Sequence, residues 1–179
     1  MSELSPRTVG STRVELSQFV EPDDANFLGK AFGGSILSLI DLAAYASATK
    51  FAGNVCVTAA FDQVDFHHPI EVGEIVSCIA HVSFVGTTSV EVTIEVFAED
   101  ILTGAKHHTN TARVTMVALK DGRPTPVPRL ICETREEKLR FVQGRVRREL
   151  RTRQRQQVLD RFAELESMSE EQLDALIAD

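Results

Sequence analysis

The sequence is poor in cysteine and has no long apolar run. Its three cysteines, Cys56, Cys78 and Cys132, follow no disulfide or metal-site spacing, so we expect reduced, buried thiols. No segment approaches the roughly 18 consecutive apolar residues of a membrane span. The N-terminus lacks the basic flank and apolar stretch of a signal peptide. These absences predict a cytoplasmic protein with no membrane partner.

Basic side chains are scarce except in one segment. The 179-residue chain has a formal net charge of −7, divided as −6 over residues 1–132, +5 over 133–157 and −6 over 158–179. An acidic body is not expected to bind nucleic acid. The Arg-rich segment is explained by a solvated face, by pairing with the acidic segment that follows, or by binding of a polyanion. The sequence leaves these three explanations open.

Hydrophobic patterning predicts one long helix and five strands. Residues 35–48 are apolar or small on nearly every helical face, which indicates a buried helix. Strands are expected over 13–20, 55–66, 75–85, 89–98 and 106–119. In the fourth of these, Glu91, Thr93 and Glu95 alternate with β-branched residues and predict a wetter face.

This order of elements predicts an α+β fold in which an antiparallel sheet wraps around one helix. The open edges of such a sheet favour a homodimer or a larger assembly. We expect one domain over residues 1–132 and a charged helical C-terminal extension of two or three helices over 133–179. Ser169 and Gln172 form a capping box before the last of these helices.

Three features near the helix start point to chemistry. Gly33 and Gly34 precede the helix and leave its first amides open to an anion or a polarised carbonyl oxygen. Asp41 is the one carboxylate in the buried helix, and burial of an unpaired carboxylate is costly. Asn26 lies in the loop before the glycines. Each alone has an ordinary explanation: close packing, a satisfied core carboxylate, a turn residue. Together they indicate hydrolytic or acyl-transfer chemistry.

The pattern Asn26-x-x-Gly29-x-x-Phe32-Gly33-Gly34-x-x-Leu37-x-x-x-Asp41 resembles the signature of acyl-CoA thioesterases with the hotdog fold. It is most similar to the bacterial YciA-like enzymes and the cytosolic acyl-CoA hydrolases. The likeness continues through Val57-Thr58, Asp65-Phe66-x-x-Pro69-x-x-x-Gly73 and Gly86-Thr87-Thr88-Ser89-Val90. It covers about residues 13–119 and leaves out the extension.

The resemblance implies a hotdog fold, a long central helix wrapped by five or six antiparallel strands, and a dimer that assembles further into a trimer of dimers. It implies hydrolysis of acyl-CoA at two composite sites. There Asp41 acts as general base or nucleophile, and Asn26 from the neighbouring subunit orients the water or the thioester. The amides around Gly33 and Gly34 polarise the carbonyl, with Gly34 counted as catalytic and Gly33 as a contact to coenzyme A.

Coenzyme A enters this prediction as part of the substrate and not as a cofactor. Small side chains and hydroxyls in one loop suit its pantetheine and phosphates: Gly86, Thr87, Thr88 and Ser89. Candidates for its nucleotide phosphates are Lys106, Arg113 and Arg129. The adjacent pairs His67-His68 and His107-His108 point to opposite faces of a strand, so no metal site is predicted.

Two other functions compete with thioester hydrolysis. The same fold can bind acyl-CoA as a sensor without cleaving it, and a polyanion-binding Arg-rich tail would serve such a regulator. A hydratase of this fold would pair an aspartate with a nearby histidine, and no histidine lies close to Asp41 in the sequence.

Overall fold

The structure is a computed structural model that describes residues 4–62, 64, 66 and 68–177. The chain divides into two compact units, which meet inside one helix between Phe141 and Val142. Among the described residues, no helix is long and apolar enough to cross a membrane. The predicted boundary at residue 132 therefore lies within the first unit, which also includes the first turns of the helix Arg135–Glu166.

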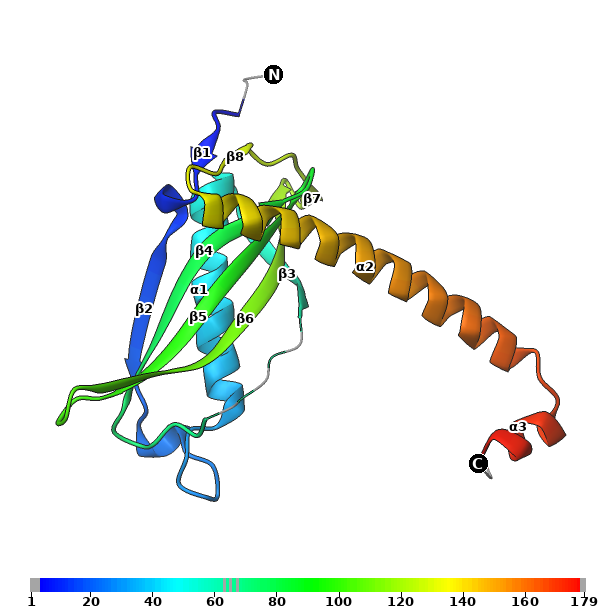
Figure 1. Ribbon diagram of the computed structural model, residues 1–179, viewed down its shortest axis with the longest axis horizontal. Coiled ribbons are helices and arrows are strands. Elements are labelled where there is room, and N and C mark those ends of the chain that lie inside the picture. Colours follow the sequence, from blue (N-terminus) through cyan, green and yellow to red (C-terminus); the bar gives the residue numbers. More distant parts are fainter. Residues whose placement is uncertain (1–3, 63, 65, 67, 178–179) are drawn as a thin grey trace. The chain divides into compact units, whose positions relative to one another are not determined.

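The first unit is a curled antiparallel sheet packed along one helix (Figure 1). Helix α1 spans Gly33–Ala52, and the path of the sheet runs β2-β4-β5-β6-β3. The main strands are β2 (Val14–Phe19), β3 (Cys56–Phe61), β4 (Ile75–Val85), β5 (Ser89–Asp100) and β6 (Ala105–Lys120). The smaller elements are β1 (Arg7–Thr8), η1 (Gly10–Thr12), η2 (Pro22–Asp24), β7 (Arg123–Pro124) and β8 (Leu130–Ile131). The expected hotdog fold is confirmed.

The core forms where α1 lies on the sheet. Small side chains on the helix, among them Ala43, Ala44 and Ala48, are fully buried and allow a close approach to the strands. Ile40 and Phe51 fill the space beside them. The facing strand residues follow the two-residue period expected of one sheet face. They are Val76, Cys78, Ala80, Val82, Val90, Val92, Ile94, Val96, Ala112, Val114, Met116 and Ala118.

The ends of α1 follow from local sequence. Gly53 has a φ of 66° and donates its N–H to the Thr49 carbonyl, so a residue that tolerates the left-handed conformation ends the helix. At the other end, Phe32 is the N-cap residue and makes no side-chain cap hydrogen bond. The start of α1 is therefore left with amides that no capping side chain satisfies.

The outer face of the sheet differs from the expectation. Glu91 and Thr93 are buried, with exposed fractions of 2% and 6%, so the predicted wetter face is wrong at these positions. Ser83 links them, because its hydroxyl donates to the Glu91 carboxylate and accepts from Thr93. The reason is a second layer. The first turns of helix α2 (Arg135–Glu166) lie on this face, with the Phe141 ring 5.1 Å from that of Phe84.

A second contact on the outer face joins α2 to β4 and β5. Arg140 Nη1 lies 2.8 Å from His81 Nε2, and its Nη2 lies 3.7 Å from the Glu95 carboxylate. Because the guanidinium only donates, His81 Nε2 must accept, which requires the neutral imidazole. Burial and the Arg140 charge both lower the pKa of His81, and this agrees with the neutral form.

The second unit contains the rest of α2 and helix α3 (Glu170–Ile177). Both helices were expected from the spacing of apolar residues. The predicted capping box is confirmed, since Ser169 N–H donates to Gln172 Oε1 at 2.9 Å and Gln172 N–H donates to Ser169 Oγ at 3.4 Å.

Candidate active site

Asp41 is paired with a hydroxyl that the sequence did not single out. Thr58 Oγ1 donates to Asp41 Oδ1 at 2.6 Å and also lies 3.5 Å from Met116 Sδ. Thr58 stands on β3, where the register with β6 shifts between Thr58 and Ala60. Irregularities of this kind re-aim a side chain at a strand edge. The result is a carboxylate with one oxygen fixed by a hydroxyl, while none of the residues that the structure describes donates a hydrogen bond to the other.

The environment of Asp41 is wetter than a buried helix predicts. In one subunit Asp41 is half-buried, and its neighbours Leu42 and Tyr45 are 55% and 38% exposed. The expectation that α1 is buried on every face is therefore wrong for a single subunit. Val57 and Phe61 on β3 are exposed as well, and with Leu42 and Tyr45 they form an apolar surface around Asp41, which we call the β3 rim.

The start of α1 offers two backbone donors. Ser35 and Ile36 both donate their N–H groups to the Phe32 carbonyl, whereas no acceptor among the described residues takes the N–H of Gly33 or Gly34. A Cβ at Gly34 would lie 2.4 Å from the ring of Phe32, so that ring would have to move for any larger residue. The glycines are the first residues of α1 and not residues before it, and their N–H groups are those of a helix start.

Asn26 uses its side-chain oxygen to shape the loop before α1. Its Oδ1 accepts from Leu28 N–H at 2.8 Å and from Lys30 N–H at 3.3 Å. Its backbone N–H donates to the Lys30 carbonyl at 2.7 Å. Because both partners of the side-chain oxygen are N–H groups, the amide orientation is set, and Nδ2 is the atom directed to other partners. Asn26 therefore presents a hydrogen-bond donor.

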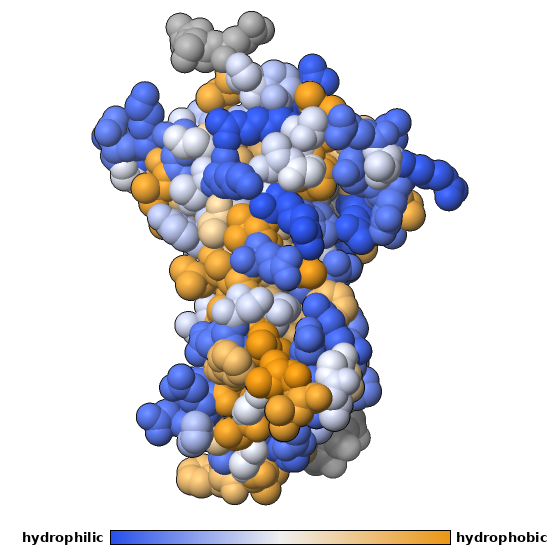
Figure 2. Space-filling model, turned by 90° about the vertical axis from the view of Figure 1, so that its left-hand side faces the viewer, coloured by the Kyte–Doolittle hydropathy of each residue, from blue (hydrophilic) through white to orange (hydrophobic). Residues whose placement is uncertain are grey.

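Apolar side chains surround this loop. Figure 2 views the side of the molecule that carries β2 and shows them gathered over its lower part. Phe19 and Phe32 are 49% and 57% exposed, and Phe27 and Leu28 at the loop tip are more exposed still. The donors of Asn26 and the helix start thus lie beside an uncovered apolar surface.

Within one subunit the donors and the carboxylate are too far apart to act on one carbonyl. Gly34 and Asp41 are seven residues apart on α1, which corresponds to about 10 Å along the helix axis. A carbonyl oxygen held by the amides and a water held by Asp41 must both lie within bonding reach of the same carbon. The structure brings Asp41 together with Thr58, whereas the side-chain hydrogen bonds of Asn26 are with Leu28 and Lys30 in the loop before α1.

The Gly86–Ser89 loop lies at the Asp41 end of the sheet. Val90 pairs with Met116, which pairs in turn with Thr58 on β3. Two backbone hydrogen bonds fix the loop. The Thr87 carbonyl accepts from Val127 N–H and the Thr88 carbonyl accepts from Ala118 N–H, each at 3.0 Å. Its Thr87 side chain is exposed.

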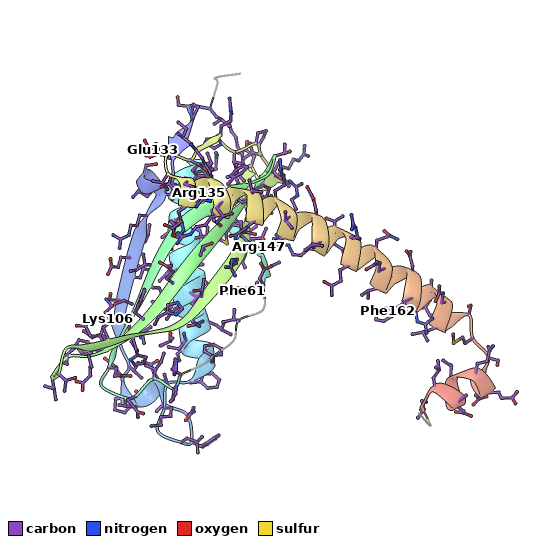
Figure 3. All side chains as sticks on the ribbon, in the orientation of Figure 1. Phe61, Lys106, Glu133, Arg135, Arg147 and Phe162 are labelled. Carbon is purple, nitrogen blue, oxygen red and sulfur yellow. The ribbon has the colours of Figure 1, made fainter. Side chains whose placement is uncertain are left out.

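The other candidate residues are more distant or lie elsewhere. Lys106 stands on the far hairpin (Figure 3), about 30 Å of strand from the Gly86–Ser89 loop, and pairs with Glu99 at 3.7 Å. Asp65 and His67 fall outside the described residues. The rings of His68 and His107 meet edge to face at 6.1 Å. The residues that the structure describes contain no group of three or more possible metal ligands.

Thr58 is the site residue that sequence reasoning missed. It lies in the stretch that carries the family likeness, yet a threonine on a strand is ordinary because β-branched residues favour strands. Only the fold, which places β3 beside the middle of α1, identifies it as a partner of Asp41.

The chain is similar to several known proteins. Residues 28–105 match the family described as Thioesterase superfamily. The protein VdlD of Helicobacter pylori is 40% identical over 146 residues, which are 82% of this chain and 84% of that protein. The uncharacterised acyl-CoA thioester hydrolase YkhA of Bacillus subtilis is 38% identical over 138 residues, which are 76% of this chain and 80% of that protein.

Solved structures agree with this similarity. An apo-hexameric acyl-CoA thioesterase has a TM-score of 0.80 at 36% identity, over 84% of this chain and 97% of that one. An acyl-CoA hydrolase from Staphylococcus aureus, in complex with butyryl coenzyme A, coenzyme A and coenzyme A disulfide, has a TM-score of 0.79 at 31% identity, over 90% of this chain and 99% of that one. Variants of that hydrolase with alanine for one asparagine, one aspartate or one threonine are also similar.

Proposed function

Since the chain belongs to the thioesterase superfamily, in its hotdog-fold group of acyl-CoA thioester hydrolases, we propose that it hydrolyses acyl-CoA to free coenzyme A and a carboxylic acid at sites shared between two subunits. The observation that carries this proposal is the hydrogen bond between Thr58 and Asp41 at the edge of the sheet. It holds a carboxylate in one orientation beside an exposed apolar surface.

The spacing of three residues supports the assignment. Asn26, Asp41 and Thr58 stand 15 and 17 residues apart, and so do the asparagine, aspartate and threonine that were replaced in the Staphylococcus aureus variants. The residue types and their order also agree. We therefore assign these three residues of this chain to one active site, with Thr58 as a positioning residue for Asp41.

Asp41 takes the proton of the attacking water. The water oxygen bonds to the thioester carbon, one proton passes to the Asp41 carboxylate, and the carbonyl electron pair moves onto oxygen. The N–H groups of Gly33 and Gly34 and the Nδ2 of Asn26 donate to that oxyanion. When the intermediate collapses, the carbon–sulfur bond breaks and the departing sulfur takes the proton from Asp41.

Direct attack by Asp41 on the thioester is the other route that these residues allow. It forms an anhydride that water then cleaves. A single turnover in ¹⁸O-labelled water separates the two routes. The general-base route leaves Asp41 unlabelled, whereas hydrolysis of the anhydride at the enzyme carbonyl places ¹⁸O in its carboxylate.

The distance along α1 supports a composite site. Because one subunit separates its donors from Asp41 by about 10 Å, we propose that Asn26 and the helix-start amides face Asp41 and Thr58 of a second copy. The exposed β3 rim is the apolar surface that this copy would cover. The hexameric state of similar thioesterases supports a homo-oligomer, which we take to be a trimer of dimers.

Coenzyme A is proposed to lie along the Gly86–Ser89 loop, with Thr87, Thr88 and Ser89 beside its pantetheine arm and Gly33 close to the thioester. A cytoplasmic location also belongs to the proposal. All three cysteines are unpaired, which fits a reducing compartment.

Mixed oligomers test the composite site. Asn26→Ala and Asp41→Ala chains, each expected to lose at least about 100-fold in thiol release, are unfolded together, refolded and assayed with acyl-CoA substrates of short to long chain. A dimer with one chain of each kind has one complete site, so about one quarter of wild-type activity should return. Each variant refolded alone is the control, and oligomeric mass is measured for all samples.

Two results would contradict the proposal. If the refolded mixture regains no activity, while each variant is inactive alone and has normal oligomeric mass, each site lies within one subunit. A wild-type protein that binds acyl-CoA but releases no thiol would be the sensor considered above.

A further inference from the structure

The C-terminal extension, residues 133–179, has two halves of opposite charge. The segment 133–157 has a net charge of +5 and the segment 158–179 a net charge of −6. Helix α2 is continuous through the point where the sign changes, since it runs from Arg135 to Glu166. Within α2, residues 142–157 are therefore basic, whereas residues 158–166 carry Asp160, Glu164 and Glu166 against one arginine, and the other acidic side chains follow further along the chain. Figure 3 labels Arg147 in the basic part of α2 and Phe162 in the acidic part.

An exposed apolar row runs along this part of α2. Val146, Leu150, Val158 and Phe162 are 45%, 54%, 42% and 57% exposed. They lie four residues apart, with Gln154 at the centre of the row where a fifth apolar residue would stand. Rows of residues four apart form the ridges by which helices most often pack on one another. The row is symmetric about Gln154.

We propose that the extension binds a second copy of itself, with the two α2 helices crossing antiparallel about a two-fold axis at Gln154. In this arrangement Leu150 lies opposite Val158 of the other copy beside the axis, and Val146 and Phe162 lie at the margins of the contact. The basic half of each helix faces the acidic half of the other, with Arg148 near Asp160. A contact of this kind is self-complementary, as a two-fold interface must be.

Charge selects this orientation and this partner. A parallel pair would place like charges together, which is unfavourable. Folding of α3 back onto its own α2 would also place like charges together. The connection is three residues long, so the acidic residues of α3 (Glu170, Glu171 and Asp174) would lie beside Asp160 and Glu164 of α2. A nucleic acid would engage the basic half but would leave the apolar row and the acidic half uncovered. A second copy would cover the apolar row and would place an oppositely charged segment beside both the basic half and the acidic half.

Disulfide cross-linking at the axis tests the proposal. In a Cys132→Ser background, Gln154→Cys places two thiols at the two-fold axis, within the roughly 6 Å between Cα atoms that a disulfide requires. Gln143→Cys is the matched control, an exposed glutamine on the same helix whose two copies would be about 30 Å apart. After mild oxidation of the full-length protein, non-reducing electrophoresis should show linked pairs for Gln154→Cys and single chains for Gln143→Cys.

Charge exchange tests the reason for the pairing. Adding Arg145→Glu and Arg148→Glu to Gln154→Cys should lower the linked fraction at least about tenfold at low salt. Further addition of Asp160→Lys and Glu164→Lys should restore it, since the two halves again differ in sign. Thiol release should be equal in all variants, because these residues lie outside the active site.

Three outcomes would overturn the proposal. They are single chains for Gln154→Cys, equal linkage of the two cysteine variants, or linkage that charge reversal leaves unchanged. Steeply salt-dependent binding of DNA or RNA by variants that do not cross-link would assign the basic half to a polyanion.

Discussion

Replacement of Thr58 by valine removes the hydroxyl that holds Asp41 and leaves the shape of the side chain almost unchanged. The Thr58 Oγ1 to Asp41 Oδ1 distance of 2.6 Å is that of a strong hydrogen bond to a charged group. Such bonds are worth about 1.5–3 kcal/mol. If that energy serves to orient the carboxylate in the transition state, its loss lowers kcat by about 10- to 150-fold.

The assay is thiol release across a range of acyl-CoA concentrations. We expect Thr58→Val to lower kcat with KM nearly unchanged, because the lost contact is to Asp41 and not to the substrate. Thr58→Ser keeps the hydroxyl and should retain kcat within about threefold of the wild type. Light scattering of each variant shows whether the oligomer is intact.

The reasoning is refuted if Thr58→Val has wild-type kcat, or if Thr58→Ser loses as much activity as Thr58→Val. The first result would make the hydrogen bond irrelevant to catalysis. The second would show that the γ-methyl group, which valine keeps and serine lacks, is needed as well, so that the hydroxyl alone would not explain the position of Asp41.

Two further predictions concern buried titratable groups. The pKa of His81 is lowered by burial and by Arg140, so below about pH 6.5 the unfolded chain binds the proton that the native imidazole resists, and stability falls as the pH drops. His81→Gln should lessen the fall in Tm between pH 7 and pH 5, and an equal fall in both proteins would contradict this. Burial raises the pKa of the Cys78 thiol to about 12, so Cys78 should react with a thiol reagent at pH 8 only after unfolding. Mass spectrometry of the labelled native protein checks this, and modification of native Cys78 at the rate of unfolded protein would be the contrary result.

The main elements could be predicted from the sequence because each carries its own periodic signal. The bounds of β4 agree with the expected strand, and those of β5 and β6 differ by one or two residues at their ends. The two-residue strands β1, β7 and β8 were not predicted, since so short a segment has no period. The extent of the helix at its N-terminus was underestimated, because α1 begins at Gly33 and glycine lowers helix propensity.

The misses in burial have a different cause. Alternation along β5 correctly identifies the face that packs on α1. It contains no information about the first turns of α2, which lie on the other face and bury Glu91 and Thr93. The exposed side of α1 is the opposite case. Leu42 was expected to be buried with the rest of the helix, and in one subunit it is 55% exposed.

Asn26 shows how far residue types alone lead. Taken alone, Asn26 is explained as a turn residue, and a role in orienting water or the thioester is what the family resemblance implies. The hydrogen bonds of its Oδ1 show that the side chain is turned to donate. For Asp41 the sequence correctly indicated the need for a partner, and the partner came from a strand 17 residues further along.

The parallel pairing of β1 with β8 has a consequence for how such a chain can be extended. Arg7 lies beside Leu130 and Thr8 beside Ile131, so the first and last strands of the body lie side by side, and only the first turns of α2 follow within this unit. Two bodies could therefore be joined in one polypeptide by a short linker without threading either fold. Gene duplication would then yield a covalent pair whose two halves are free to diverge.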